Sequence, residues 1–465
     1  MKRRSFLKNI GSFGAAGLIS PVLPLMPKKA FADHFPQLQF RNVAAANLPR
    51  YINVFLYGGP SELAGNLSNI EDINANSQNP YPNNLNPNDA NTLVTANNLW
   101  STAGGTIMEQ MLASGDLSIY RTMNRRKDNN RAHGISVIQN LVGNLDVDTP
   151  GIATTLAWII ENNNPFGKAV DELLFPFITF EGESRAFKRV GHEVPVALKP
   201  LALNPNLSAN VFNPYQRSNQ TRAGLANGGA RDLALEALAL QTNEAVGLQM
   251  LGDGFIQRAL YADRVDALFA AADIANAVTT YGYGDGNFGR RMSAAISLML
   301  ANQETVFVSL GSGGLGGWDD HSDAIVNYTN RMQELMVALQ AAANHLNSAS
   351  LAGIVHADKI IINVFGDFGR NVNMNDSRGW DHGNNQNLYT VGGKGLRALG
   401  KIVGRTKRIG DSGVNRQFTS PDDGSYEFEP FALASSMFAA YGVDNPEAIT
   451  GEAPIDETQP GETLL

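Results

Sequence analysis

Apolar runs that alternate with amphipathic stretches constrain the fold of this chain more than any other feature. Residues 360–365 read Ile-Ile-Ile-Asn-Val-Phe, which is typical of a strand covered on both faces. In residues 323–347, just before that run, apolar side chains recur at steps of three and four and predict a helix with one apolar stripe. Since a helix between two buried strands is a crossover connection, the pattern predicts an α/β fold with a mostly parallel sheet.

The same pattern of periodicity extends along the rest of the chain. It predicts strands at 51–57, 117–121, 177–180, 305–310 and 359–365, and helices at 106–114, 133–142, 151–161, 231–250, 255–277, 289–302 and 323–347. Because no predicted strand interrupts residues 231–302, we expect a helical insertion there, within one large domain at 33–450. The Asn-rich residues 66–99 and residues 182–230 are predicted to be polar loops, and 451–465 a mobile acidic tail.

The N-terminal residues 1–32 have the parts of an export signal in the right order. An arginine pair, Arg3 and Arg4, precedes a Ser-Phe-Leu-Lys run, as in twin-arginine signals. A modestly apolar stretch follows, and then a small-x-small cleavage site that ends at Ala32. We therefore expect export by the twin-arginine translocase, removal of residues 1–32 by a signal peptidase, and a periplasmic or secreted mature protein.

Charge and cysteine content exclude some modifications of the mature chain and disfavour some classes of binding partner. The sequence has 36 Lys and Arg, 44 Asp and Glu, and no cysteine, so disulfides and a lipidated N-terminal cysteine are excluded. The expected signal holds six of the basic residues and no acidic one, which leaves 30 against 44 and a net charge of −14. Such a surface disfavours nucleic acid and anionic lipid as partners. The apolar stretch at 10–25 is interrupted by glycines and prolines and is too short for a stable membrane anchor.

Two Trp-Asp-His clusters follow two of the predicted strands, at the sheet edge where α/β proteins bind ligands. The first contains Asp319 and His321, which would point to the same side of an extended segment. The second contains Asp381 and His382; one of the two would face the same centre, and the other would orient a ligand. Carboxylates and imidazoles that converge can hold a divalent metal, such as zinc, manganese or calcium, or act as an acid and base pair.

Other residues at these strand ends are candidates for substrate chemistry. Arg370 could hold a substrate anion through a bidentate contact, and Ser61 follows a Gly-Gly-Pro turn at the end of the first strand. Each candidate has a structural alternative. The turn before Ser61 could be chosen for backbone reasons, and Asp320 or Asp381 could cap a helix or turn.

In their order along the chain, these landmarks resemble a family of twin-arginine-exported bacterial proteins of unknown function, domain-of-unknown-function family 1501. That family is grouped with the alkaline phosphatase and sulfatase superfamily. The matching pieces are the segment 54–61, His133 with 141–143, and the segments 317–321, 367–370 and 381–383. The resemblance implies a three-layer α/β/α sandwich, like that of alkaline phosphatase, whose relatives hydrolyse phosphate or sulfate esters at a metal centre.

The resemblance also implies roles for single residues. Asp319, His321 and His382 match the ligands of one metal, Asp367 matches a ligand of a second metal, and Ser61 matches the nucleophile. In the superfamily pattern a histidine follows the residue equivalent to Asp367, whereas this chain has Phe368, which implies one metal or none. Two functions stay open: a binding protein for a glycan, anion or partner protein in a partly degenerate metal site, or a metal-dependent phosphate or sulfate ester hydrolase.

Overall fold

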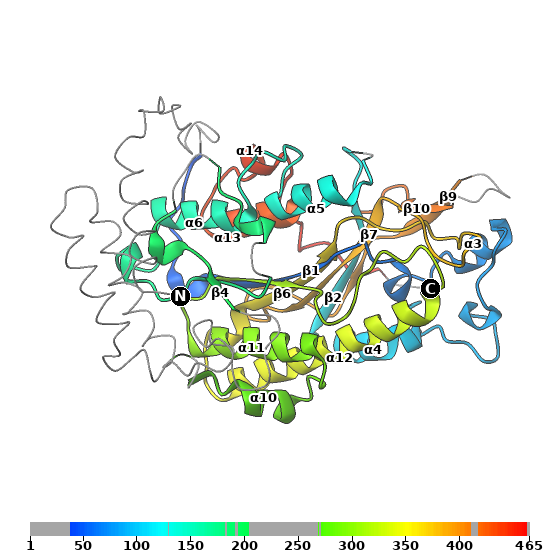
Figure 1. Ribbon diagram of the computed structural model, residues 1–465, viewed down its shortest axis with the longest axis horizontal. Helices are drawn as coiled ribbons and strands as arrows, with labels where there is room; N and C mark the ends of the chain where they lie inside the picture. The colour runs from blue at the N-terminus through cyan, green and yellow to red at the C-terminus, as the bar shows by residue number, and fades with distance from the viewer. Residues whose placement is uncertain are drawn as a thin grey trace, which may run out of the picture.

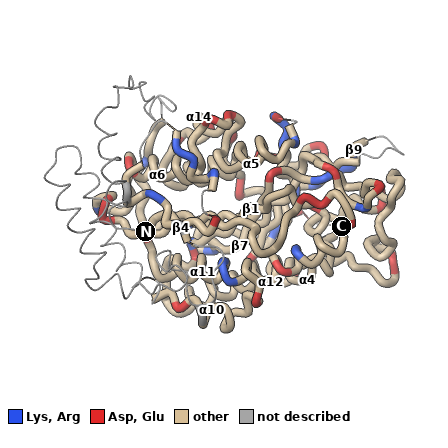
Figure 2. The backbone as a smooth tube through the Cα atoms, in the orientation of Figure 1, with Lys and Arg blue, Asp and Glu red and all other residues tan. Residues whose placement is uncertain are grey.

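The computed structural model describes residues 38–128, 130–181, 184–190, 194–203, 268, 271–410 and 417–462. The expected export signal, the helix expected at 231–250 and most of the helix expected at 255–277 lie outside these ranges. Within them, no helix combines the length and the apolar character that crossing a membrane requires. Basic and acidic residues are interspersed over the described part of the chain in the view of Figure 2.

An eight-stranded sheet forms the middle of the structure, with strand order β4-β3-β5-β1-β6-β7-β2-β8. Its strands are β1 (Arg50–Leu56), β2 (Leu117–Asn124), β3 (Phe177–Thr179), β4 (Leu201–Ala202), β5 (Phe307–Gly311), β6 (Ile360–Gly366), β7 (Asn385–Gly392) and β8 (Ile402–Val403). Only β7 runs against its neighbours, β6 and β2, and every other pair in this sheet is parallel. The predicted mixed α/β fold with a mostly parallel sheet is therefore confirmed, although the antiparallel strand β7 was not expected.

Helices cover both faces of this sheet (Figure 1). One face carries α4 (Gly105–Ala113), α10 (Ile274–Tyr281), α11 (Asn287–Ala301) and α12 (Ala324–Leu351), and the other carries α5 (His133–Val142), α6 (Ile152–Asn162), α13 (Ala432–Ala440) and α14 (Glu447–Thr450). The crossover helix expected at 323–347 is α12, which links β5 to β6. A short helix, α3 (Ile70–Asn76), and a hairpin of β9 (Thr406–Ile409) and β10 (Phe418–Pro421) lie beyond one end of the sheet.

Alternation along the central strand divides the interior into two apolar cores. In β1, Ile52 and Val54 belong to the core that includes α11 and α12, whereas Tyr51 and Phe55 belong to the core that includes α6 and α13. Successive side chains of a strand point to opposite faces, so a strand covered on both sides can be apolar at consecutive positions, as β1 is at 54–56. The continuous apolar runs in the sequence reflect this double burial.

One expectation about the loops was wrong. Residues 66–99 were expected to form a polar surface loop, but this segment includes α3 and buries Leu67, Ile73, Tyr81 and Leu85 in the first core. Asparagine is frequent in this segment, and its apolar residues are spaced too irregularly to show a helix or strand period. Burial here depends on packing against the rest of the protein rather than on local periodicity.

Candidate metal centre

Two buried tryptophans anchor the loops that carry the predicted site residues. Trp318 and Trp380 are both fully buried and pack against Tyr328 of α12, with ring centroids 6.1 and 5.1 Å from its ring. The neighbouring acidic residue Asp320 forms an ion pair with Arg331 of the same helix. Each tryptophan therefore fixes its loop to the core, and the residues that follow it are directed toward the sheet edge.

The two loops also pair with each other through their main chains. Ser322 pairs with Arg378, and Trp380 N donates a hydrogen bond to Asp320 O at 2.7 Å. At Gly379 a Cβ atom would lie 2.1 Å from the main-chain carbon of His321, so a glycine is needed for this approach. This pairing brings residues that are about sixty positions apart in the chain into one rigid cluster.

Three imidazoles surround one carboxylate oxygen in this cluster. Asp319 Oδ1 lies 3.3 Å from Nε2 of His133, 3.0 Å from Nε2 of His321 and 3.5 Å from Nε2 of His382. The Nε2 atoms of His321 and His382 lie 3.1 Å apart. The donor atoms of His133, Asp319 and His382 all lie within 4.8 Å of one another and could hold a metal ion.

The other ring nitrogen of each imidazole contacts an oxygen. His133 Nδ1 lies 2.7 Å from Asp367 Oδ2, and His321 Nδ1 lies 3.3 Å from Asp381 Oδ1. His382 Nδ1 donates to the carbonyl oxygen of Arg131 at 2.7 Å. Because the oxygens beside His133 and His382 accept hydrogen bonds, the protons of these two rings are held on Nδ1, and their Nε2 atoms are left with lone pairs. His321 contacts a carboxylate through each of its ring nitrogens.

Lone pairs that face one another this closely repel unless a cation lies between them. His133 Nε2 is buried and makes no hydrogen bond in the described structure, although Asp319 Oδ1 is 3.3 Å away. Metal-binding histidines in proteins are oriented by the same device, a carboxylate or carbonyl on the second ring nitrogen. The donor set therefore fits a divalent metal ion, with Asp367, Asp381 and a main-chain carbonyl orienting the ligands.

Asp367 is held in place by the turn that follows β1. It is fully buried, and its Oδ1 accepts hydrogen bonds from the main-chain nitrogens of Gly58 and Gly59, each at 3.0 Å. Both glycines have positive φ angles, and a Cβ at Gly58 would lie 2.5 Å from Asp319 N. The Gly-Gly turn thus serves the site by fixing the carboxylate that orients His133, and it needs glycine for its conformation.

Arg370 ties the same turn to both tryptophan loops. Its side chain is buried, and it donates to the carbonyl oxygens of Gly59 and Trp380 at 2.6 and 3.0 Å and to that of Trp318 at 3.1 Å. It also donates to Asp319 Oδ1 at 2.6 Å. These contacts give Arg370 a positioning role, since they orient the carboxylate at the centre of the cluster; binding of a substrate anion by Arg370 stays a prediction.

The charges in the cluster shift three pKa values. The hydrogen bond to Asp367 raises the pKa of His133 above its usual value, so protons compete with a metal at this residue. Burial lowers the pKa of His382, and the charge of Arg370 lowers it further. Burial disfavours ionisation of Asp319, but the hydrogen bond and charge of Arg370 outweigh it and lower the pKa of this carboxyl. Asp319 is therefore a carboxylate at neutral pH, as a metal ligand must be.

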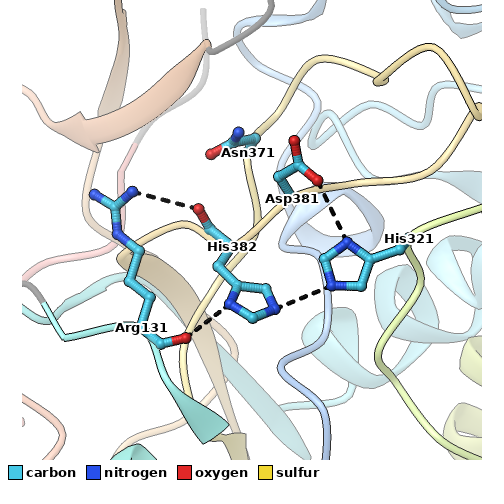
Figure 3. Close-up of a pocket in the computed structure, with 5 residues that line it drawn as sticks. All are labelled: Arg131, His321, Asn371, Asp381 and His382. Atoms are coloured by element: carbon cyan, nitrogen blue, oxygen red, sulfur yellow. Dashed lines mark hydrogen bonds and ion pairs between the residues drawn. The ribbon is translucent and has the colours of Figure 1, made fainter.

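A pocket of about 280 Å³ opens beside the cluster. Its lining residues are Arg131, His321, Asn371, Asp381 and His382. Figure 3 shows Arg131 and His321 on opposite sides of the His382 ring, with Asn371 and Asp381 above it. Since the side chains of Asp319 and His321 are nearly half exposed, at 47% and 46%, a small molecule can reach the metal-binding atoms.

The structure brings five predicted metal-site residues together and leaves one predicted catalytic residue apart. The five are Asp319, His321, Asp367, Asp381 and His382, with the aspartates at 367 and 381 placed behind histidines. Ser61 is buried, and its hydroxyl accepts a hydrogen bond from Leu63 N at 3.4 Å. Among the described contacts, none joins Ser61 to the cluster, so its role as a nucleophile stays a prediction.

No functional role was predicted for His133, which the structure places in the cluster. This histidine is the first residue of α5, and α5 follows β2, whose direction matches that of β1 and β6. Two signals for it were present in the sequence: its place after a predicted strand, which also identified the other two histidines, and its place among the landmarks of the family resemblance. Phe368 packs against His133 and His382, with ring centroids 4.7 and 4.5 Å away.

Comparison with known proteins identifies a family without an assigned activity. Residues 49–425 match the family described as "Protein of unknown function (DUF1501)". A search of curated proteins finds no significant match. The matched region contains the whole histidine cluster and every residue that orients it.

Proposed function

This chain belongs to the DUF1501 family of unknown function, and from that premise we propose that it is a metal-dependent hydrolase of phosphate or sulfate esters. The proposal includes a three-layer α/β/α sandwich of the alkaline phosphatase type, for which the helices on both faces of the sheet are the support. It also includes twin-arginine export to the periplasm or medium, for which the order of residues in 1–32 is the support.

The observation that carries the proposal is the set of distances around Asp319 Oδ1. Ligand atoms about 2.0–2.1 Å from a tetrahedral ion lie about 3.3 Å from one another. The three Nε2 atoms lie 3.0, 3.3 and 3.5 Å from Asp319 Oδ1, close to this spacing. With the mutual approach of the donor atoms of His133, Asp319 and His382, these distances support two histidines and one aspartate as the donors of a single metal site. His321 lies beside this site, and a three-donor set leaves a position for water.

The donor chemistry favours zinc among the metals that the sequence left open. Calcium prefers six to eight oxygen ligands, whereas this cluster offers imidazole nitrogens and one carboxylate. Manganese accepts such a set with lower affinity. A bound zinc ion would supply Lewis acidity and an activated water at neutral pH.

The residues of the chain would prepare the substrate and hold the donors in place. Asp367 keeps the proton of His133 on Nδ1, Asp381 contacts His321 Nδ1, and Arg370 holds the Asp319 carboxylate. Since Ser61 is buried away from the cluster, the proposal assigns the attack on the ester to water. Arg131, on the pocket wall, provides a positive charge beside which an ester anion can lie.

The test begins with metal content. We expect the mature protein, purified without chelator, to contain about one zinc ion per chain by elemental analysis. His133→Ala and Asp319→Ala should lose it, because each removes one donor of a three-donor site. His356→Gln is the matched control, because His356 contacts the carbonyl oxygens of Met299 and Leu300 and takes no part in the cluster.

Hydrolysis is then measured on nitrophenyl phosphate, bis-nitrophenyl phosphate and nitrophenyl sulfate. Turnover by the wild-type chain and His356→Gln that disappears with the metal would support the hydrolase. A stoichiometric metal without turnover of any of the three esters would overturn it and favour the alternative, a binding protein for a glycan, anion or partner. Burial of Ser61 and the presence of Phe368 beside two imidazoles are the observations that favour that alternative.

A further inference from the structure

One wall of the pocket carries a buried acceptor without a donor. Asn371 is only 2% exposed, yet it lines the pocket beside His382 and Asp381. Its Oδ1 has no hydrogen-bond partner among the described residues. The main chain of Asn371 is fixed, because its nitrogen donates to Asp381 O at 2.8 Å. An acceptor held in this way destabilises the folded protein unless a ligand or water supplies a proton to it.

A fixed positive group lies on the other side of the same pocket. Arg131 Nε donates to Asn384 Oδ1 at 2.6 Å, and its Nη1 lies 3.4 Å from the carbonyl oxygen of His382. The guanidinium also lies over the ring of Phe418, 4.8 Å from the centroid. These contacts hold the charge of Arg131 at the pocket wall, across the His382 ring from His321 (Figure 3).

We infer that Arg131 and Asn371 select the substrate, and that it is an ester anion whose alcohol part carries a further hydroxyl group. The inference rests on the proposed function, since the metal cluster defines where the ester group lies. Arg131 attracts the anionic group, and Asn371 Oδ1 accepts a hydrogen bond from the hydroxyl. A sulfate or phosphate ester of a simple alkyl alcohol has no hydroxyl to donate and leaves Asn371 unsatisfied.

This arrangement provides discrimination as well as affinity. Sites built to hydrogen-bond a hydroxyl group reject analogues that lack it, because a buried polar group is then left unpaired. Because the pocket holds about 280 Å³, the selected molecule is small or is the end group of a larger one. The substrate class is therefore the phosphate or sulfate ester of a polyhydroxylated alcohol.

The experiment measures binding with probes that cannot be hydrolysed. Dihydroxybutylphosphonate and butylphosphonate have the same length and charge and differ only in two hydroxyl groups; the corresponding sulfonates form a second pair. Isothermal titration of the purified chain gives the ratio of affinities within each pair. We expect the dihydroxy compound of at least one pair to bind roughly tenfold tighter. Metal content and melting temperature are recorded for every variant.

Three variants separate the two roles. Asn371→Leu should abolish the preference for the dihydroxy compound, whereas Asn371→Asp, which keeps an acceptor, should retain it. Arg131→Met should weaken both members of a pair by a similar factor and leave their ratio unchanged. Equal affinities within both pairs, a preference that survives in Asn371→Leu, or no binding of any probe would overturn the inference. Because these results do not depend on turnover, they are distinct from failure of the hydrolase proposal, which metal content and ester hydrolysis decide.

Discussion

Two polar regions lie near the end of β1, and they differ in whether the protein satisfies their charges. In the histidine cluster, three Nε2 atoms face the carboxylate of Asp319, whose side chain is 47% exposed. In the second region, Glu62 is 1% exposed, and its two carboxylate oxygens accept hydrogen bonds from Asn385 and Thr419. Arg121 lies in the same region and donates to the carbonyl oxygens of Gly65 and Asn97 at 2.8 and 2.7 Å.

The comparison separates a site from a structural network. Glu62 and the loop carrying Asp319 both follow strands at the same sheet edge, and both place acidic groups among basic ones. Around Glu62 the protein itself supplies the hydrogen-bond donors, Asn385 and Thr419, so joining these segments accounts for the whole network. Around Asp319, Arg370 donates to Oδ1, but the Nε2 atoms of His133 and His382 face the same oxygen, and a metal ion could lie among these three donor groups. Unmatched hydrogen-bonding capacity, rather than the presence of charged residues, identifies the site.

The largest expected effect tests whether the two buried arginines act alike. Arg370→Met and Arg121→Met should each lower the free energy of unfolding by roughly 3–5 kcal/mol, because each leaves several buried carbonyl oxygens without donors. Only Arg370→Met should also weaken zinc binding, by roughly tenfold, because Asp319 loses the hydrogen bond that orients it. Urea unfolding and a zinc competition assay give the two values. If both variants bind zinc as the wild type does, Arg370 has no positioning role.

A pH series sharpens the description of the Glu62 region. Burial raises the pKa of Glu62 to about 7, although Thr419, Asn385 and Arg121 act in the opposite direction. Since the folded protein then holds a proton that the unfolded chain releases above its ordinary pKa of 4.5, this group stabilises the fold fully below about pH 4.5. That contribution is lost as the pH rises through 7 and amounts to roughly 3 kcal/mol.

Glu62→Gln removes this titration. Between pH 5 and pH 8, the unfolding free energy of the wild type should therefore fall by roughly 2–3 kcal/mol more than that of the variant. Urea unfolding at both pH values provides the measurement, with zinc removed from both proteins by a chelator. An identical pH dependence in the two proteins would show that Glu62 is ionised in the fold.

The smallest effect compares the carboxylates that orient the histidines. Asp367→Asn keeps an oxygen for Gly58 and Gly59 but turns an amide toward His133 Nδ1, so the ring should lose the tautomer that leaves Nε2 free. Zinc affinity should fall roughly 10–100-fold, as for other residues behind metal ligands. Asp381→Asn should lower the zinc affinity by a smaller factor, because Asp381 is 41% exposed and its Oδ1 lies 3.3 Å from His321 Nδ1. Equal losses in the competition assay would contradict the ranking.

Local patterns in the sequence were enough to predict much of the architecture. The five expected strands correspond to β1, β2, β3, β5 and β6, and the longest expected helix corresponds to α12. These elements are covered on one or both sides by the core, so the spacing of their apolar residues along the sequence predicts which faces are buried. The strand β7 was not predicted, because five of its eight residues are not apolar although all eight are buried. The five are Asn385, Gln386, Asn387, Thr390 and Gly392.

By itself, the sequence predicted which loops form the candidate metal centre, because Asp319, His321, Asp381 and His382 stand just after strand signals and sheet edges of that kind bind ligands. Only the tertiary structure decided the division of roles. It brought in His133 from the other side of the sheet order, placed Asp367 and Asp381 behind histidines, and buried Ser61 and Arg370. Strand order and loop pairing join residues that are distant in sequence, and no local period records which atoms will face one another.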